Sequence, residues 1–310
     1  MKVFLNMNNL PKFKRSVLTI GSYDGVHLGH REILKKVVQK AKEIEGESIL
    51  VTFHPHPRIF LQGPESGVRL LNTTQEKIQI LEKTGLDHLV IVPFDEDFSS
   101  QSAEAYVRDF LAECFDPHTL IVGYDHRFGK DRSGNFEFLE EKAAVYGYEL
   151  IQIEKQTLEE LAVSSTKIRS ALEKGDIPLV NRLLGYPYIL SGKVVHGKQI
   201  GRDIGYPTAN IQVEDPYKLI PPEGVYAVRG ELRERKWEGM MYIGRRPTLN
   251  DNQERSIEVN IFDFDEDIYY EFLKIYLIDY VRSDKRFDSL DELKAQLSSD
   301  KQKSLEILAS

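Results

Sequence analysis

The stretch GSYDGVHLGH, from Gly21 to His30, decides how the first part of this chain folds. It follows an apolar run from Ser16 to Ile20 and leads into an amphipathic run from Glu32 to Ala41. A turn that leaves a strand and enters a helix directs the unpaired amides of the helix N-terminus at one point, where an anion can bind. The sequence therefore predicts an anion site just beyond the first strand.

Two histidines give this turn its chemical character. His27 and His30 are three residues apart, so they share one face of the first helical turn, and Gly29 between them allows a close approach. The stretch itself contains no lysine, and the chain has no GxxxxGK[ST] loop, so the imidazoles are the groups expected to meet a triphosphate. Donors placed where charge develops on an α-phosphate favour nucleotidyl transfer.

Two other interpretations stay open on these residues alone. A histidine pair at this spacing is also half of a zinc site, which His54, His56 and Asp125 would complete. Simple capping of the helix by Asp24 is the second alternative, although a cap explains neither the two histidines nor the three glycines.

The same stretch resembles the GxFDGVHxGH signature of the bacterial bifunctional riboflavin kinase/FMN adenylyltransferases, which are nucleotidyltransferases of the HxGH class. Ser22 and Tyr23 replace the Asn-Phe pair that the family prefers. The resemblance implies catalytic roles for His27 and His30. It also implies nucleotide or phosphate binding by Gly21, Asp24 and Gly29.

Composition sets the broad class of protein. A chain of 310 residues, 41% hydrophobic and 29% charged, is long enough for two domains with cores of their own. The net charge of −8 argues against nonspecific binding of nucleic acid or of an acidic membrane, so we expect small-molecule partners, with an oligomer possible. Cys114 is the only cysteine and no signal peptide or transmembrane run is evident, so we expect a cytoplasmic protein.

Apolar periodicity predicts an α/β fold in two domains. Short apolar runs alternate with amphipathic ones up to Ile153, which is typical of a Rossmann-like parallel sheet with helices on both faces. The predicted strands are Ser16–Ile20, Ser48–Phe53, His88–Val92, Thr119–Val122 and Glu149–Ile153. The predicted helices are His30–Glu45, Thr74–Thr84, Ala103–Phe115 and Phe136–Tyr146.

The pattern changes near Leu184. Glycines and prolines then punctuate short alternating runs, which predict an antiparallel β-barrel, and helical spacing returns from Ser289 to Leu308. We therefore place a domain boundary after residue 184. The resemblance implies an adenylyltransferase domain at residues 1–184 and a kinase domain at residues 185–310.

A second phosphate motif is predicted in the run AVSSTKIRSAL, residues 162–172. Hydroxyls and a guanidinium at a helix start suit an oligophosphate, but they equally suit an N-cap followed by a surface arginine. The run resembles the family's SSTxIR motif, which implies phosphate binding by Ser164, Thr166 and Arg169.

Two loops of the first domain carry further resemblance. VGYDHRFG, residues 122–129, is similar to VGxDFxFG and implies nucleotide binding by Asp125 and Arg127, with His126 where phenylalanine is common. TFHPHP, residues 52–57, is similar to TFxPHP and implies that Pro55 and Pro57 line the flavin end of the site.

The second domain holds the stretch GKQIGRDIGYPTANI, residues 197–211. Thr208 and Asn210 are two apart, so in an extended segment they point the same way and offer hard oxygen ligands for Mg²⁺. The stretch resembles the glycine flap and PTAN motif of riboflavin kinases. The resemblance implies phosphate binding by Gly197, Lys198, Gly201 and Arg202.

SIEVNIF, residues 256–262, completes the match to the kinases. Glu258 falls where the family places the glutamate that accepts the proton of the riboflavin 5′-hydroxyl, a role that suits a carboxylate. Asn260 stands where histidine is frequent. The resemblance also implies flavin binding by Arg282 and Arg286.

These observations predict a bifunctional enzyme of FAD synthesis. The second domain is expected to convert riboflavin and ATP to FMN and ADP, and the first to convert FMN and a second ATP to FAD and diphosphate, with Mg²⁺ accompanying ATP. The alternatives are a flavin or nucleotide sensor without turnover and a metallohydrolase that uses the histidines of the first domain.

Overall fold

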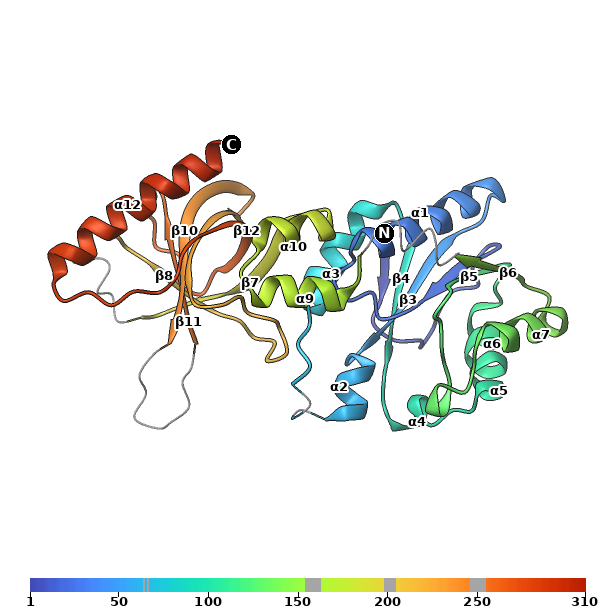
Figure 1. The fold of residues 1–310 in the computed structure, drawn as a ribbon. Helices are drawn as coiled ribbons and strands as arrows, with labels where there is room; N and C mark the ends of the chain where they lie inside the picture. Colours follow the sequence, from blue (N-terminus) through green and yellow to red (C-terminus); the bar gives the residue numbers. More distant parts are fainter. Residues whose placement is uncertain (64, 66, 154–162, 198–204, 246–254) are drawn as a thin grey trace. The chain divides into compact units, whose positions relative to one another are not determined.

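The structure is a computed structural model that describes residues 1–63, 65, 67–153, 163–197, 205–245 and 255–310. The chain divides into two compact units, Met1–Ser165 and Thr166–Ser310, each with a hydrophobic core of its own (Figure 1). The division falls at the start of α9 (Ser165–Glu173). Its contacts therefore assign α10 (Ile177–Leu184) to the second unit. The boundary between the two activities after residue 184 stays a prediction.

The first unit is built on a six-stranded sheet in which every pair of neighbouring strands is parallel. In spatial order its strands are β1 (Lys2–Phe4), β4 (His88–Pro93), β3 (Ser48–His54), β2 (Val17–Ile20), β5 (Thr119–Gly123) and β6 (Glu149–Ile153). All of β2 is buried, as a strand covered on both faces must be. The predicted parallel α/β fold is confirmed, and β1 is an additional edge strand.

Helices connect these strands, and the two short ones at residues 57–62 and 96–99 are additional to those that the periodicity predicts. They are α1 (Leu28–Glu43), α2 (Pro57–Gln62), α3 (Thr74–Leu81), α4 (Glu96–Ser99), α5 (Ala103–Ala105), α6 (Glu113–Phe115) and α7 (Phe136–Tyr146). The helix predicted for Ala103–Phe115 forms as α5, a π-helical stretch from Tyr106 to Ala112, and α6 in direct succession. Its buried side chains, including Tyr106 and Phe110, join the aromatic core beneath the sheet.

The strand order creates a switch point beside β2. β3 and β4 lie on one side of β2, whereas β5 and β6 lie on the other. The loops that leave the carboxyl ends of β2 and β5 therefore flank one crevice, and ligands of open parallel sheets bind at such a crevice. These are the loops that begin at Gly21 and after Gly123, both of which the sequence had already marked.

The second unit is a closed antiparallel barrel followed by one long helix. Around the barrel the strands are β10 (Arg235–Arg245), β11 (Arg255–Ile261), β8 (Ala209–Gln212), β7 (Tyr188–Val195), β12 (Phe272–Arg282) and β9 (Gly224–Leu232). α12 (Leu290–Ala309) begins after its N-cap Ser289 and packs on β9, β10 and β12. The predicted barrel and C-terminal helix are confirmed.

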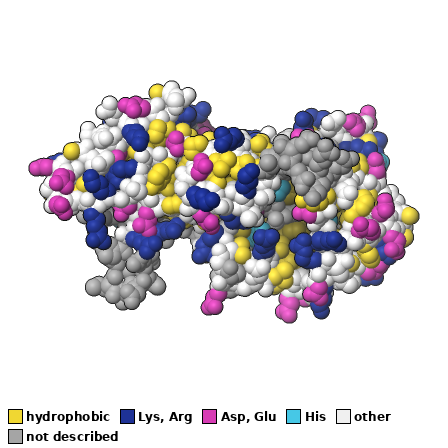
Figure 2. Space-filling model, in the orientation of Figure 1, with side chains coloured by type: hydrophobic (Ala, Val, Ile, Leu, Met, Phe, Trp, Pro, Cys, Tyr) yellow, Lys and Arg dark blue, Asp and Glu magenta, His cyan; other side chains and the backbone are white. Residues whose placement is uncertain are grey.

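Two surface features bear on possible partners. None of the helices in the described ranges is both long enough and apolar enough to cross a membrane. On the face drawn in Figure 2, the coloured Lys and Arg side chains are intermixed with Asp and Glu side chains.

Candidate active sites

The loop between β2 and α1 ends in a histidine that caps the helix. His27 precedes α1 in an extended conformation, and its Nδ1 accepts the backbone N–H of His30 at 3.3 Å. Because Nδ1 accepts this bond, the ring proton of a neutral His27 lies on Nε2. His27 therefore satisfies one amide of the helix N-terminus and keeps a donor on the other side of its ring.

The two predicted histidines form a stacked pair. Their ring centroids are 3.7 Å apart with the planes inclined by 14°, and the Tyr23 ring lies 4.7 Å from His30. Burial lowers the pKa of His30 well below its ordinary value, and the nearby charges of His27 and Lys77 lower it further. His30 is therefore neutral near pH 7, and its buried Nδ1 has no hydrogen-bond partner among the described residues.

The start of the SSTKIR run lies against this loop, although the two are far apart in sequence. Ser165 Oγ donates to the carbonyl oxygen of Asp24 at 2.9 Å. A Cβ placed on Gly29 would lie 3.3 Å from the His27 ring and 3.3 Å from a methyl group of Val163. The structure thus places Val163 and Ser165 against the loop that carries His27 and Gly29, and phosphate binding here stays a prediction.

Hydrogen bonds to a buried carboxylate accompany an uncommon backbone conformation in the loop between β2 and α1. Tyr23 and Val26 have φ angles of 46° and 35°, in the left-handed region that non-glycine residues rarely adopt. The Asp24 carboxylate, 2% exposed, accepts the amides of Leu71 and Asn72 at 2.9 and 3.4 Å. Asp24 contacts the protein's own backbone, and its role in nucleotide binding stays a prediction.

Lys77 is the residue of this site that the sequence did not reveal. Gly21–His30 itself contains no lysine, but α3 places Lys77 beneath this loop. Its side chain is 7% exposed, and Nζ donates to the carbonyl oxygen of Ser22 at 2.7 Å. The signal that would have found it is its spacing from the buried Ile80 and Leu81, which puts a lysine on the apolar face of its helix.

The loop after β5 separates its polar side chains. Asp125 and Arg127 are exposed, whereas His126 turns inward and lies against Phe128 with ring centroids 5.7 Å apart. Burial lowers the pKa of His126 to about 4. This apolar setting suits the phenylalanine that the family commonly has there, and ligand binding by Asp125 and Arg127 stays a prediction.

The histidines of the TFHPHP loop have structural partners. His54 Nδ1 lies 3.0 Å from Thr74 Oγ1, and His56 caps α2 by accepting the amide of Arg58 at 3.1 Å. Within the described ranges, no three His, Cys, Asp or Glu side chains lie close enough together to hold a metal ion. The donor set that the zinc alternative needs is thus not found in that part of the chain. Contact of Pro55 and Pro57 with flavin stays a prediction.

Further along the SSTKIR run, α9 carries the two remaining predicted phosphate ligands. Thr166 and Arg169 are three residues apart and share one face of the helix. Thr166 and the neighbouring Ser164 are exposed, and Arg169 is half-buried. All three stay predicted ligands.

Strand pairing in the barrel brings together the three residues predicted for the kinase. Asn210 on β8 lies directly opposite Glu258 on β11, so their side chains share a face of the sheet. Thr208 Oγ1 donates to Glu258 Oε2 at 3.3 Å. Hydroxyl, amide carbonyl and carboxylate oxygens are the donors that Mg²⁺ takes in proteins, so this set fits a magnesium ion carried by phosphates.

Gly197 and Asn260 keep this cluster in shape. A Cβ on Gly197 would lie 2.0 Å from Asn210 Nδ2, so a larger residue would displace the amide. Asn260 Nδ2 donates to the carbonyl oxygen of Pro207 at 2.8 Å, which fixes the residue before Thr208. The predicted phosphate ligands Lys198, Gly201 and Arg202 lie outside the described residues.

The two arginines expected near the flavin have different surroundings. Arg282 donates from Nε to Asp300 Oδ1 and from Nη2 to Asp300 Oδ2, both at 2.8 Å. Asp300 on α12 is 2% exposed, so this two-pronged pair ties the helix to the barrel. Arg286 is exposed in the loop that follows. Flavin binding by either arginine stays a prediction.

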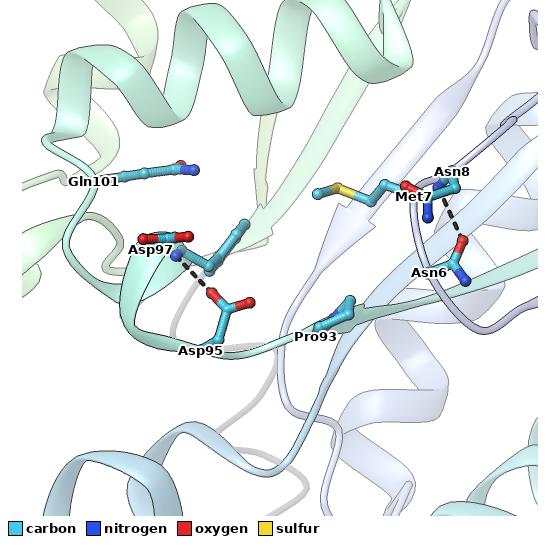
Figure 3. A pocket seen from close by; sticks show the side chains of 8 residues that line it. Asn6, Met7, Asn8, Pro93, Asp95, Asp97 and Gln101 are labelled. Carbon is cyan, nitrogen blue, oxygen red and sulfur yellow. Dashed lines mark hydrogen bonds between the residues drawn. The ribbon is translucent and has the colours of Figure 1, made fainter.

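A hollow of about 240 Å³ lies at the carboxyl end of β4, which β3 separates from the switch point. Figure 3 shows Asp95, Asp97 and Gln101 on one side of it and Asn6, Met7 and Asn8 on the other. Asp95 caps α4 by accepting the amide of Phe98 at 2.8 Å. None of the residues that the sequence assigned to a site lines this hollow.

Comparisons with known proteins cover both units. The family model for FAD synthetase matches residues 10–167, and the family model for riboflavin kinase matches residues 184–308. A bifunctional riboflavin kinase/FMN adenylyltransferase of Bacillus subtilis is 35% identical over 94% of this chain and 92% of its own length. Proteins of the same name from Listeria monocytogenes and Escherichia coli K12 are 38% and 34% identical over 92% and 97% of this chain, and over 90% and 96% of their own lengths.

A solved structure matches the fold over almost the whole chain. The crystal structure of a protein from Streptococcus pneumoniae, named a macrolide-efflux protein, has a TM-score of 0.83, 30% identity, and coverage of 96% of both chains. That name belongs to the Streptococcus protein, and the likeness contributes the fold.

Proposed function

This chain belongs to the bifunctional riboflavin kinase/FMN adenylyltransferase family, and on that premise we propose how its two units divide the synthesis of FAD. The barrel transfers the γ-phosphoryl group of ATP to riboflavin and releases FMN and ADP. The parallel-sheet unit joins FMN to the AMP part of a second ATP and releases FAD and diphosphate. The observation that carries the division is that each unit gathers its own polar cluster, His27 with His30 in one and Thr208, Asn210 and Glu258 in the other.

In the adenylyl step, the nucleophile needs no activation. A phosphate oxygen of FMN is already ionised at neutral pH, and it attacks the α-phosphorus of ATP as the bond to diphosphate breaks. The demand on the protein is to hold the two anions in line and to stabilise charge on the α-phosphate oxygens. His27 serves this demand through its Nε2–H, and His30 through the ring stacked on it. Ser164, Thr166 and Arg169 complete the proposed phosphate contacts.

The neutral state of His30 favours this role. Two imidazolium rings with centroids 3.7 Å apart would repel each other, and the lowered pKa of His30 keeps that ring uncharged. Neutral donors at a helix N-terminus attract phosphate without holding it as tightly as a cluster of cations would, so product release stays feasible. We propose that Asp125 and Arg127 contact the nucleotide and that Pro55 and Pro57 contact the flavin.

In the kinase step, the nucleophile is an alcohol and requires a base. Glu258 accepts the proton of the riboflavin 5′-hydroxyl while that oxygen attacks the γ-phosphorus and the bond to ADP breaks. The bond from Thr208 occupies Oε2, which orients the carboxylate and leaves Oε1 for the substrate. Thr208 and Asn210 would hold Mg²⁺ together with the ATP phosphates, and a magnesium ion bound there supplies neutralising charge for the transfer.

One incubation tests the proposed function. Purified protein is mixed with riboflavin, ATP and MgCl₂, and the flavins and nucleotides are resolved by chromatography over time. FMN should appear first and FAD later, with ADP and diphosphate in matching amounts, and a magnesium chelator should stop both steps. Bound flavin with no consumption of ATP would overturn the proposal and favour a sensor.

A further inference from the structure

Lys77 is a buried lysine that the proposed adenylyl step does not yet use. It lies on α3, one turn after a capping box formed by Thr73 and Glu76, and its side chain is 7% exposed. Burying an ammonium group is costly unless the fold supplies partners, so a lysine in this position calls for an explanation. Its Nζ donates a hydrogen bond to the Ser22 carbonyl oxygen at 2.7 Å.

The Ser22 carbonyl is held from two sides. Besides Lys77 on α3, Thr52 on β3 donates to the same oxygen at 3.1 Å. A carbonyl oxygen has two lone pairs, so these two donors fill its capacity. Ser22 lies between β2 and the histidines, and these two hydrogen bonds fix the backbone where the chain leaves the sheet.

This anchor leads directly to the histidine pair. The next residue, Tyr23, adopts φ 46°, and its ring lies 4.7 Å from His30 and within 3.1 Å of where a Cβ on Gly21 would stand. His30 in turn stacks on His27 at 3.7 Å. A backbone shift at Ser22 therefore moves the Tyr23 ring, and the Tyr23 ring supports the imidazole that faces it.

The charge of Lys77 also affects the histidine pair. Burial lowers the pKa of Lys77, and the nearby Asp24 carboxylate opposes that effect. The cation also lowers the pKa of His30, after the larger effects of burial and of His27. Among the described residues, the groups that face His30 are His27 at the N-cap of α1, Tyr23 from the loop and Lys77 from α3.

We propose that Lys77 is a positioning residue for adenylyl transfer, which fixes the Ser22 carbonyl together with Thr52 and thereby sets the place of the His27–His30 pair. The proposal rests on the proposed function of the first unit. It assigns Lys77 no contact with ATP or FMN.

The test compares Lys77→Met with wild type in the full chain. Methionine has similar length but neither charge nor donor, so kcat for FAD formation from supplied FMN should fall by about 10²-fold, the scale of a misplacement near 1 Å. KM for ATP and for FMN should stay within about threefold of wild type, because a positioning residue does not touch them. Riboflavin phosphorylation by the barrel should be unchanged and serves as the internal control.

Two further variants define the mechanism. Lys77→Arg keeps charge and donors and should recover at least a tenth of the wild-type kcat. Lys83→Met is the matched control, because Lys83 is an exposed lysine of the turn that follows α3, and it should leave both activities unchanged. NMR titration of the histidine rings should show the pKa of His30 higher in Lys77→Met than in wild type, which a purely structural role would not produce.

If Lys77→Met does not fold, Thr52→Val replaces it, because valine matches threonine in shape and removes the second donor to the same oxygen. That variant should lower kcat for FAD formation by about tenfold. The inference is overturned if Lys77→Met, or Thr52→Val in its place, keeps kcat within threefold, or if KM for ATP rises while kcat stays constant. Failure of wild type to form FAD at all would instead contradict the proposed function.

Discussion

The two units prepare for the same cosubstrate, ATP, in opposite ways. In the parallel sheet, a loop with left-handed residues presents a stacked pair of imidazoles at the N-terminus of α1. In the barrel, paired extended strands place hydroxyl, amide and carboxylate oxygens beside one another. The first arrangement offers hydrogen-bond donors to an anion, whereas the second offers oxygens to a cation and to a proton.

The difference follows from which oxygen attacks. FMN brings a phosphate that is already ionised, so its site requires donors and alignment but no base. Riboflavin brings a hydroxyl group, so its site requires a carboxylate and charge neutralisation. The chemistry of each unit is therefore set by the nucleophile rather than by ATP.

The largest expected effect comes from removing the base. Glu258→Gln keeps an oxygen to accept the bond from Thr208 but takes no proton at neutral pH, so riboflavin phosphorylation should fall by about 10³-fold. FAD formation from supplied FMN should not change. Initial rates of both reactions measure the contrast, with the exposed Glu238→Gln on β10 as control. Equal loss of both activities would contradict the division of labour.

Removing the first imidazole tests the other side of the comparison. His27→Ala removes the helix cap and the Nε2 donor, so FAD formation should fall by about 10²-fold, the usual effect of losing one donor to a developing oxyanion. FMN formation should be spared, and the exposed His118→Ala should affect neither rate. Loss of FMN formation as large as the loss of FAD formation would contradict this account.

Substitutions at two glycines, one in each unit, compare how closely the two sites are packed. A Cβ on Gly197 would lie 2.0 Å from the Asn210 amide, whereas a Cβ on Gly29 would lie 3.3 Å from the His27 ring. Gly197→Ala should therefore move Asn210 and lower kinase activity by about tenfold, and Gly29→Ala should lower adenylylation only a few-fold. The rates of both reactions and the melting temperatures of both variants measure these effects. A larger loss of activity in Gly29→Ala than in Gly197→Ala would contradict this prediction.

The smallest expected effect is a pH dependence of stability in the first unit. His30 and His126 both have lowered pKa values, that of His126 at about 4, because burial disfavours their charged forms. Below about pH 6.5 the unfolded chain therefore binds protons that the native state excludes. The free energy of unfolding then decreases as the pH is lowered, by up to about 1.4 kcal/mol per pH unit for each group.

Melting temperatures between pH 7 and pH 5 measure this loss. His126→Phe, which installs the residue common in the family, should reduce the slope and raise stability at pH 5 relative to wild type. An unchanged slope in that variant would exclude His126 as a contributor.

The sequence predicts best those features whose determinants are local. The strand, turn and helix around Gly21–His30 lie within one short stretch, so periodicity and residue type define them without help from the rest of the fold. Register between distant strands has no such local signal. That Asn210 lies opposite Glu258 follows only from the closed barrel, and no local pattern in the sequence indicates this pairing.

Buried charge is where sequence reasoning is weakest. Lys77 and Arg282 carry side chains that ordinarily face water, and only the three-dimensional fold gives them a carbonyl group and the Asp300 carboxylate as partners. Asp24 shows the same difficulty, since the two backbone amides that its carboxylate accepts belong to Leu71 and Asn72, far along the chain. In each case the deciding partner lies 18 or more residues away in the chain.

Closure of the barrel also constrains how copies of this chain can associate. Every described barrel strand is bonded on both sides, so another chain cannot extend that sheet, and contacts through this unit must be made by side chains. The parallel sheet instead terminates at β1 and β6, each bonded to one neighbour among the described strands. Backbone-mediated assembly, whether useful or harmful, is thus open to the adenylyltransferase unit and closed to the kinase.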